Sequence, residues 1–106
     1  MLRHAFEIVA EAADATEAIA FARELQPDAA LLDLNMPGGG GRTAVPGIVA
    51  ASPGTAIVVI SGDEEDSIVR ELLIAGAVAY VRKGTDPSDT VRRAIVAHAD
   101  TRFEGV

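Results

Sequence analysis

Three polar residues in this sequence each adjoin a short apolar run, and together they could handle a phosphoryl group. Asp33 lies within "LLDLNMPG", Ser61 ends "AIVVIS", and Lys83 follows "AVAYVR". A carboxylate can attack phosphorus as a nucleophile. A hydroxyl can donate to one phosphoryl oxygen, and an ammonium group can neutralise another. These residue types therefore predict a phosphoryl-accepting site if the fold brings them together.

The apolar runs are typical of parallel strands that are buried on both faces. We expect strands over 6–12, 29–34, 56–61 and 77–82. In an open parallel sheet, ligands bind outside the carboxyl ends of the strands. The three polar residues sit at such ends, so neighbouring strands would direct their side chains into one crevice.

Segments with helical spacing of apolar residues separate these strands. The predicted helices cover 14–26, 43–52, 63–75 and 86–99. Asp63 and Asp86 are expected N-caps, and Pro46 with Gly47 is expected to define the start of the second helix. We expect residues 35–42, "NMPGGGGR", to form a loop. Alternating strands and helices predict an α/β fold with a doubly wound parallel sheet.

The composition limits the classes of function. A chain of 106 residues predicts one domain, and a net charge of −7 argues against nucleic-acid binding as its main function. The absence of cysteine excludes disulfides and zinc–thiolate sites. No apolar run approaches the roughly 20 residues of a membrane span. The start, "MLRHAF", lacks the apolar core of a signal peptide, so we expect a cytoplasmic protein without direct membrane contact.

The three motifs together resemble the receiver domain of response regulators in two-component signalling. The matching stretches are "LLDLNMPG", "VVISG" and "GAVAYVRK", with 28 residues from Asp33 to Ser61 and 22 more to Lys83. The resemblance covers essentially the whole chain. It is closest to receivers that precede helix-turn-helix output domains, because Gly84 follows Lys83 where many receivers have proline. It implies a flavodoxin-like (βα)5 fold with strand order 2-1-3-4-5.

The resemblance also implies a role for individual residues. Asp33 is similar to the phosphoacceptor, Ser61 to the hydroxyl that contacts the phosphoryl group, and Lys83 to the lysine that forms an ion pair with it. Tyr80 is similar to the aromatic residue that turns inward on activation, so Ser61 and Tyr80 would form the switch. Asn35 is similar to the residue whose backbone carbonyl binds Mg²⁺ beside Asp33.

One departure from the family concerns the first strand, the acidic pair that ends it and most of the first helix. The chain starts with "LRHAF", at about the end of that helix. Asp33 and the Asn35 carbonyl alone would make a poor Mg²⁺ site, because this ion needs several oxygen ligands. We therefore expect residues 1–106 to form a single, N-terminally incomplete receiver of about four strands and four helices, without an output domain, or a degenerate receiver.

Membership in this family would imply a phosphoacceptor signalling module rather than an enzyme. A histidine kinase or phosphotransfer protein would transfer a phosphoryl group to Asp33, with self-dephosphorylation as the only turnover. The change would reach a partner-binding face over 62–99. That face could form a homodimer, or contact an output domain if the natural chain is longer.

Two other functions stay open on the residues alone. A pseudo-receiver would bind partners without being phosphorylated, and the absent acidic pair favours it. A phosphatase of the haloacid-dehalogenase type would also use an aspartate, a hydroxyl and a lysine at strand ends. It would need a second aspartate two residues after the nucleophile, and Asn35 occupies that position.

Overall fold

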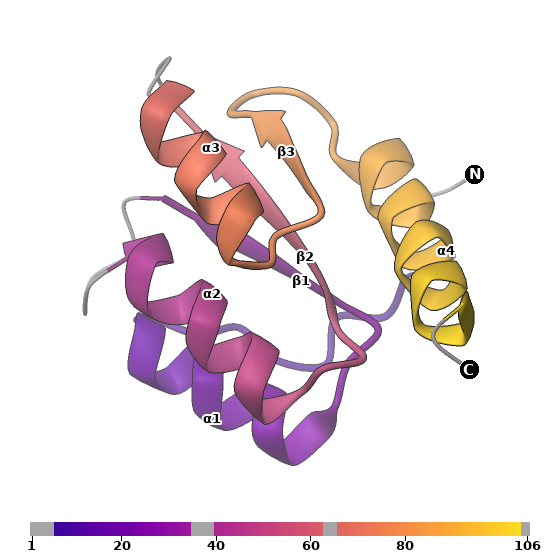
Figure 1. The fold of residues 1–106 in the computed structure, drawn as a ribbon. Helices are drawn as coiled ribbons and strands as arrows, with labels where there is room; N and C mark the ends of the chain where they lie inside the picture. The colour runs from indigo at the N-terminus through magenta and orange to yellow at the C-terminus, as the bar shows by residue number, and fades with distance from the viewer. Residues whose placement is uncertain (1–5, 35–39, 63–65, 105–106) are drawn as a thin grey trace.

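The computed structural model describes residues 6–34, 40–62 and 66–104, in which helices and strands alternate (Figure 1). The elements are α1 (Ala15–Leu25), β1 (Ala29–Asp33), α2 (Gly40–Ala51), β2 (Ala56–Ser61), α3 (Asp66–Ala75), β3 (Ala79–Arg82) and α4 (Ser88–Glu104). The three strands form one parallel sheet in the order β1-β2-β3. The predicted α/β class with a parallel sheet is confirmed.

The central strand, β2, fixes the relative height of its two neighbours. Asp33 at the end of β1 is level with Ile60, and Ser61 at the end of β2 is level with Arg82 of β3. All three strands therefore end at the same edge of the sheet. The residues that follow them, Leu34, Gly62 and Lys83, begin the loops at that edge.

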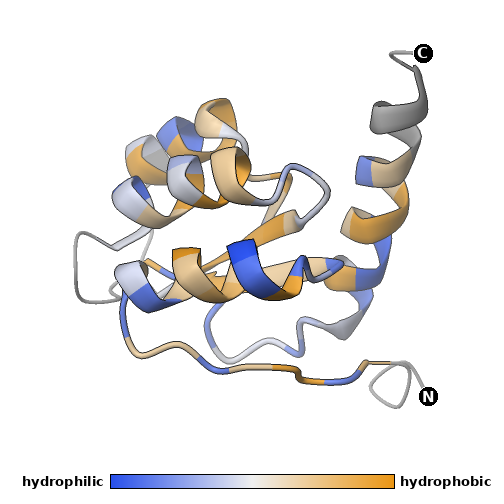
Figure 2. Cartoon of the chain, turned by 90° about the horizontal axis from the view of Figure 1, so that it is seen from below, coloured by the Kyte–Doolittle hydropathy of each residue, from blue (hydrophilic) through white to orange (hydrophobic). Residues whose placement is uncertain are grey.

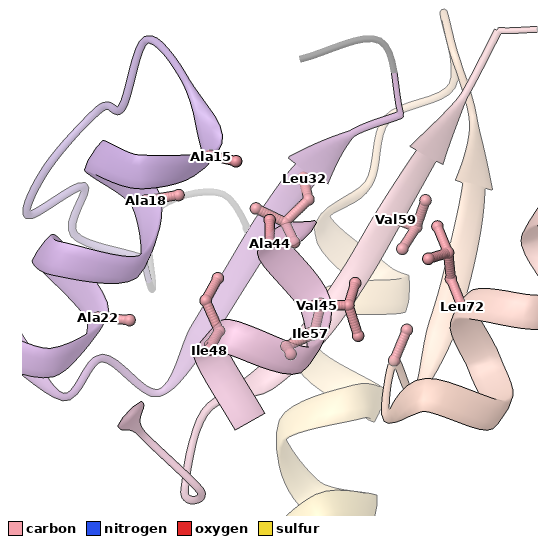
Figure 3. Close-up of a cluster of buried hydrophobic side chains, with 11 residues drawn as sticks. Ala15, Ala18, Ala22, Leu32, Ala44, Val45, Ile48, Ile57, Val59 and Leu72 are labelled. Atoms are coloured by element: carbon pink, nitrogen blue, oxygen red, sulfur yellow. The ribbon is translucent and has the colours of Figure 1, made fainter. Parts of the chain in front are cut away.

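Helices cover both faces of the sheet (Figure 1). One face carries α1, α2 and α3, and α4 packs against the other. Figure 3 shows the larger core, in which small residues of α1 face α2 and the sheet; its buried members are Ala15, Ala18, Ala22, Leu32, Ala44, Val45, Ile48, Ile57, Val59, Leu72 and Ala77. The smaller core joins Ala94 of α4 to Ala56, Val58 and Val81 of the sheet. Burial of each Val, Leu or Ile contributes about 1.5–3 kcal/mol.

The start of α1 is fixed by a reciprocal capping arrangement. The backbone N–H of Glu17 donates to Asp14 Oδ1 over 2.8 Å, and the N–H of Ala13 donates to Glu17 Oε1 over 2.7 Å. The arrangement resembles a capping box, except that the Glu17 carboxylate accepts from Ala13, the residue before the N-cap Asp14. It also fixes the direction in which the chain enters α1.

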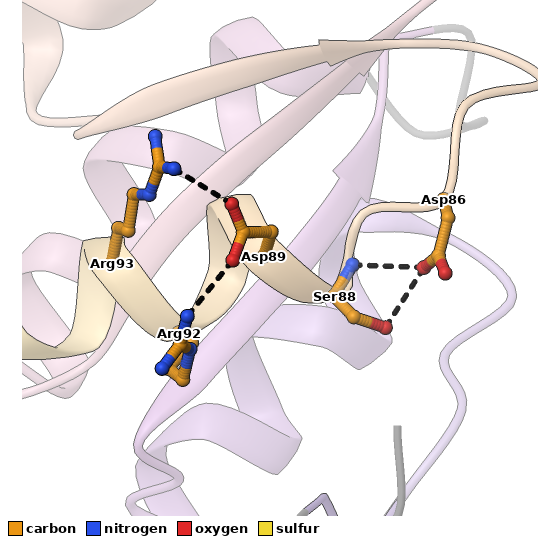
Figure 4. Close-up of polar contacts among 5 residues, drawn as sticks. All are labelled: Asp86, Ser88, Asp89, Arg92 and Arg93. Atoms are coloured by element: carbon orange, nitrogen blue, oxygen red, sulfur yellow. Dashed lines mark hydrogen bonds and ion pairs between the residues drawn. The ribbon is translucent and has the colours of Figure 1, made fainter. Parts of the chain in front are cut away.

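The start of α4 is capped by Asp86, as the sequence predicts. Asp86 Oδ1 accepts from the backbone N–H of Ser88 over 3.0 Å and from its hydroxyl over 2.8 Å (Figure 4). Asp89, in the first turn, forms ion pairs with Arg92 and Arg93 at 2.9 Å each (Figure 4). These ion pairs are exposed, so each stabilises the helix by only about 0.3–0.5 kcal/mol.

The predicted strand over 6–12 is wrong. Residues 6–12 are described but form no strand, so the sheet has three strands rather than about four. A strand needs a neighbouring backbone, and the only strand that β1 pairs with among the described residues is β2. The segment "FEIVAEA" has an apolar residue at every second position, but it lacks the hydrogen bonds to a neighbouring strand that would make it a strand.

The predicted start of the second helix is also wrong. Helix α2 begins at Gly40, so two glycines of the expected loop are helical and Pro46 lies inside the helix. The buried face formed by Gly40, Gly41, Ala44, Val45 and Ile48 explains this start, because packing against the core outweighs the poor helix propensity of glycine.

Other boundaries differ less. Strand β3 begins at Ala79 rather than residue 77, because Ala77 still donates its N–H to the Leu72 carbonyl at the end of α3. Helix α4 continues to Glu104, beyond the predicted end at residue 99. The expected cap at Asp63 lies outside the described residues. In the described part of the chain, no helix combines the length and the apolar character needed to cross a bilayer.

Candidate functional site

The structure brings two of the three predicted site residues into direct contact. Lys83 Nζ lies 3.1 Å from Asp33 Oδ2. Asp33 ends β1 and Lys83 follows β3, and β2 lies between these strands. The lysine side chain therefore reaches across the carboxyl end of β2 to the aspartate.

The Lys83 side chain passes close to Gly62, the first residue after β2. A Cβ atom built on Gly62 would lie 3.7 Å from Lys83 Cδ and 3.9 Å from Lys83 Nζ. The lysine stem thus runs over the first residue after β2. Since Gly62 has no side chain, the lysine stem passes close to the main chain at the end of β2.

Ser61 is the third predicted residue, and it ends the strand between the other two. Only 4% of its surface is exposed. Its carbonyl accepts the backbone N–H of Lys83 over 2.8 Å. This hydrogen bond holds the start of the lysine loop against the end of β2, so the main chains of Ser61 and Lys83 are fixed relative to each other.

Asp33 and Lys83 are both accessible. Their side chains are about half-exposed, so a donor molecule can approach the carboxylate from solvent. The backbone directly after Asp33 is held against β2, because the N–H of Leu34 donates to the Ile60 carbonyl over 3.1 Å. A rigid strand end thus presents a reachable carboxylate beside a cation.

Tyr80, the predicted switch aromatic, lies within β3 and is level with Val59. Its exposed fraction is 53%, so in this structure the ring points away from the core. That is the outward orientation from which an inward turn would start. Asn35, the residue expected to offer a backbone carbonyl to Mg²⁺, lies outside the described residues.

Gly40 is a positioning residue that the sequence analysis missed. Its φ is +59°, and a Cβ atom there would lie 2.7 Å from the Leu34 carbonyl oxygen, directly after Asp33. Only glycine fits so close to another backbone in this conformation. The signal in the sequence was the glycine run, which we interpreted as a loop rather than as a close approach.

The described residues do not make a Mg²⁺ site. Within 6–34, 40–62 and 66–104, no three or more His, Asp or Glu side chains are grouped so that they could hold a metal ion. The Asp33 carboxylate lies 3.1 Å from the Lys83 ammonium group. Because Mg²⁺ requires several oxygen ligands, Asp33 alone does not supply them.

The comparisons with known proteins agree with this geometry. Residues 1–95 match the family described as the response regulator receiver domain. The chain belongs to the response-regulator receiver family. Receivers of this family act in two-component phosphoacceptor signalling, and they generally bind Mg²⁺. The resemblance inferred from the three motifs is therefore confirmed.

Individual relatives show the extent of the match. The response regulator GacA of Pseudomonas viridiflava is 34% identical over 97 residues, which are 92% of this chain and 45% of GacA. The chain spans about half the length of the curated relatives it matches.

Solved structures are similar as well. A LuxR-family two-component response regulator from Aurantimonas sp. SI85-9A1 is 34% identical with a TM-score of 0.73, covering 88% of this chain and 66% of that one. A CheY-like receiver from Methanospirillum hungatei JF-1 has a TM-score of 0.78 at 24% identity, covering 97% and 82% respectively, and this match bears on the fold alone. The flavodoxin-like receiver fold is thereby confirmed.

Proposed function

We propose that this receiver accepts a phosphoryl group on Asp33 from a histidine kinase or a phosphotransfer protein. The observation that supports this most is the 3.1 Å contact between Lys83 Nζ and Asp33 Oδ2 at an accessible strand end. In the transfer, Asp33 Oδ attacks phosphorus, the bond from phosphorus to the donor imidazole nitrogen breaks, and its electron pair returns to that nitrogen. The product is an aspartyl phosphate.

The neighbouring residues have defined tasks in this proposal. The Lys83 ammonium neutralises charge on the phosphoryl oxygens, and the Ser61 hydroxyl donates to one of them. As Ser61 moves toward the new group, Tyr80 turns inward. The face over 62–99, which contains α3, β3 and α4, then changes its surface for a partner. That partner is an output domain of a longer natural protein or the same face of a second receiver.

The remaining parts of the proposal concern location and activity. We place the module in the cytoplasm, where it contacts neither membrane nor nucleic acid directly; the net charge of −7 supports the latter. We propose no enzyme activity beyond loss of its own phosphoryl group. A phosphatase would need a second aspartate where Asn35 stands.

The test is the intact-protein mass after incubation with an acyl phosphate and Mg²⁺. We expect one phosphoryl adduct on the parent chain and none on Asp33→Asn. The matched control is Asp28→Asn, which removes an exposed carboxylate at the other end of β1 and should label as well as the parent. Labelling of Asp33→Asn at the parental level would overturn the assignment of Asp33.

A second candidate function, a pseudo-receiver that binds partners without phosphorylation, is favoured by the lack of a grouped metal-binding set among the described residues. A folded chain that gains no adduct at any Mg²⁺ concentration would support it. Circular dichroism of the same sample supplies the evidence of folding, so an unlabelled, unfolded chain is not mistaken for a pseudo-receiver.

A further inference from the structure

Helix α3 joins the two strands that carry the proposed switch. It follows β2, which ends at Ser61, and precedes β3, which contains Tyr80. Along the chain, α3 is therefore the segment between the two residues that move in the proposed function. A contact that fixes α3 opposes any movement that α3 shares with them.

One such contact is an ion pair between α2 and α3. The Arg42 guanidinium donates twice to the Glu71 carboxylate, from Nε to Oε2 over 3.1 Å and from Nη2 to Oε1 over 3.2 Å. Figure 2 shows that the helices on this side of the sheet carry hydrophilic residues among hydrophobic ones. Two parallel hydrogen bonds fix the orientation of the two groups as well as their distance. The pair thus defines where α3 lies against α2.

An apolar contact adjoins the ion pair. Gly41 precedes Arg42 and Leu72 follows Glu71, and a Cβ atom on Gly41 would lie 2.8 Å from Leu72 Cδ1. Leu72 is buried in the larger core and anchors α3 there. The side chains of Arg42 and Glu71 are 60% and 51% exposed. The ion pair is therefore the part of this contact that can separate without exposing apolar surface.

The first turn of α2, which carries Arg42, is weakly held by its own helix. Gly40 and Gly41 have poor helix propensity. Pro46 has no N–H to donate to the Arg42 carbonyl, so one hydrogen bond of an ordinary helix is missing. On its other side this turn lies against β1, where Gly40 approaches the Leu34 carbonyl. The turn therefore depends on its contacts, and it links the end of β1 to α3.

We propose that the Arg42–Glu71 ion pair is a clamp that holds α3 in the state with Tyr80 outward, and that it opens when Asp33 is phosphorylated. This inference rests on the proposed function, because it concerns the regulation of the same site. The structure contains the closed pair together with an exposed Tyr80 ring. A contact made in only one of two states shifts the equilibrium toward that state. An exposed pair is weak, so the clamp adjusts the balance between the states without blocking either.

The first test is a charge-swap cycle on the unphosphorylated chain, read by hydrogen exchange of the α3 amides. Arg42→Glu places a carboxylate opposite Glu71, and adding Glu71→Arg restores an opposite-charge pair. Arg70→Glu is the matched control, because it makes the same charge change at an exposed neighbour in α3. We expect exchange about three- to fivefold faster in Arg42→Glu, and near the parental rate in the double variant and the control.

The second reading of the same samples is acrylamide quenching of Tyr80, the only tyrosine. A merely structural contact would change the exchange of α3 but not the orientation of this ring. We expect quenching of unphosphorylated Arg42→Glu to decrease toward the value of the phosphorylated parent, and the double variant to return to the unphosphorylated value.

Other results overturn the proposal. Equal exchange in Arg42→Glu and Arg70→Glu, or a double variant that stays as fast as Arg42→Glu, means that the pair does not hold α3. Faster exchange with unchanged quenching makes the pair a structural contact without a role in the switch. Neither reading needs a phosphoryl group. They therefore separate failure of the clamp from failure of Asp33 as a phosphoacceptor, which the mass measurement reports.

A covalent bridge tests the opening step. The chain has no cysteine, so Arg42→Cys and Glu71→Cys can be joined by a short bis-maleimide. The control is the same chain capped with a monofunctional maleimide. With phosphodonor, we expect one adduct on both chains and a decrease in Tyr80 quenching only on the capped chain. An equal decrease on the bridged chain would show that the switch works with the clamp closed, and would overturn the proposal.

Discussion

Lys83 Nζ and Asp33 Oδ2 are 3.1 Å apart although Asp33 ends β1 and Lys83 follows β3, the two strands that flank β2. The contact passes over Gly62, at the end of the strand between them. Because β2 is paired on both sides, it holds β1 and β3 in register, and this register determines whether the lysine can reach the aspartate. The site is therefore a property of the whole sheet and not of one loop.

Replacing Lys83 by methionine should separate its role in signalling from any role in stability. The substitution keeps most of the stem and removes the charge. Both partners are about half-exposed, so the free energy of unfolding should change by less than about 1 kcal/mol. Phosphorylation should no longer move Tyr80. Chemical denaturation measures the change in the free energy of unfolding. The fluorescence of Tyr80 during a phosphodonor titration measures whether the ring moves.

Lys83→Arg is the matched control for charge. It should retain the ion pair with Asp33 while changing the geometry of the donors. If Lys83→Met instead destabilises the chain by more than about 2 kcal/mol, the lysine is a structural residue and our assignment is wrong.

Tyr80 offers a direct optical test of the switch. It is the only tyrosine, and the chain has no tryptophan, so tyrosine fluorescence reports on this ring alone. The ring is 53% exposed in this structure. We expect acrylamide quenching of its fluorescence to decrease when Asp33 is phosphorylated. Unchanged quenching in a sample that mass spectrometry shows to be phosphorylated would argue against an inward turn, and Asp33→Asn controls for effects of the reagent.

Gly40→Ala should destabilise the fold near the site. A methyl group there would lie 2.7 Å from the Leu34 carbonyl oxygen, at a residue whose φ is +59°. Because the obstacle is backbone, we expect a loss of about 1–3 kcal/mol. Gly62→Ala is the control, since its methyl group meets Lys83 only at 3.7 Å, an ordinary contact. Equal stability of the two variants in urea titrations would show that the Gly40 contact is unimportant.

The contact between α1 and α2 can be tested at Gly47. A Cβ atom on Gly47 would overlap Ile19 Cδ1 and would lie 2.7 Å from its Cγ1. Alanine normally stabilises a helix by about 0.5–1 kcal/mol relative to glycine. Here overpacking should outweigh that gain, so Gly47→Ala should destabilise by about 1–3 kcal/mol. A double-mutant cycle with Ile19→Ala checks the cause.

The double-mutant cycle predicts the sign of the coupling free energy between the two substitutions. If the two side chains collide, Gly47→Ala should cost less in the Ile19→Ala background, or even stabilise it. Additive free energies would mean that the destabilisation has another origin.

The strands around the site could be predicted because their apolar runs fit no other kind of element. "AALLDL" and "AIVVIS" are too apolar for a surface and too short for a helix, so β1 and β2 were expected close to where they lie. The polar residues at their ends then had to meet at one edge. The contact between Asp33 and Lys83 follows from this topology, although their chemical roles stay predictions.

What could not be predicted depends on neighbours that a linear pattern does not contain. Residues 6–12 have an apolar residue at every second position, as a strand with one buried face should, but a strand requires a paired neighbour, and none of the described strands pairs with them. Pro46 and Gly47 were expected to begin a helix, as their local preferences suggest. The actual start at Gly40 depends on Leu34 and Leu72, which approach the two glycines too closely for larger residues.

The position of Lys83 also affects how this protein can be labelled in practice. It is the only lysine in the chain, and its ammonium group is about half-exposed at the site. Apart from the α-amino group, every amine-directed reagent will therefore react at the proposed phosphoryl site. Dyes, biotin and amine-coupled sensor surfaces would block Lys83, whereas a cysteine introduced on an exposed helix would leave it intact.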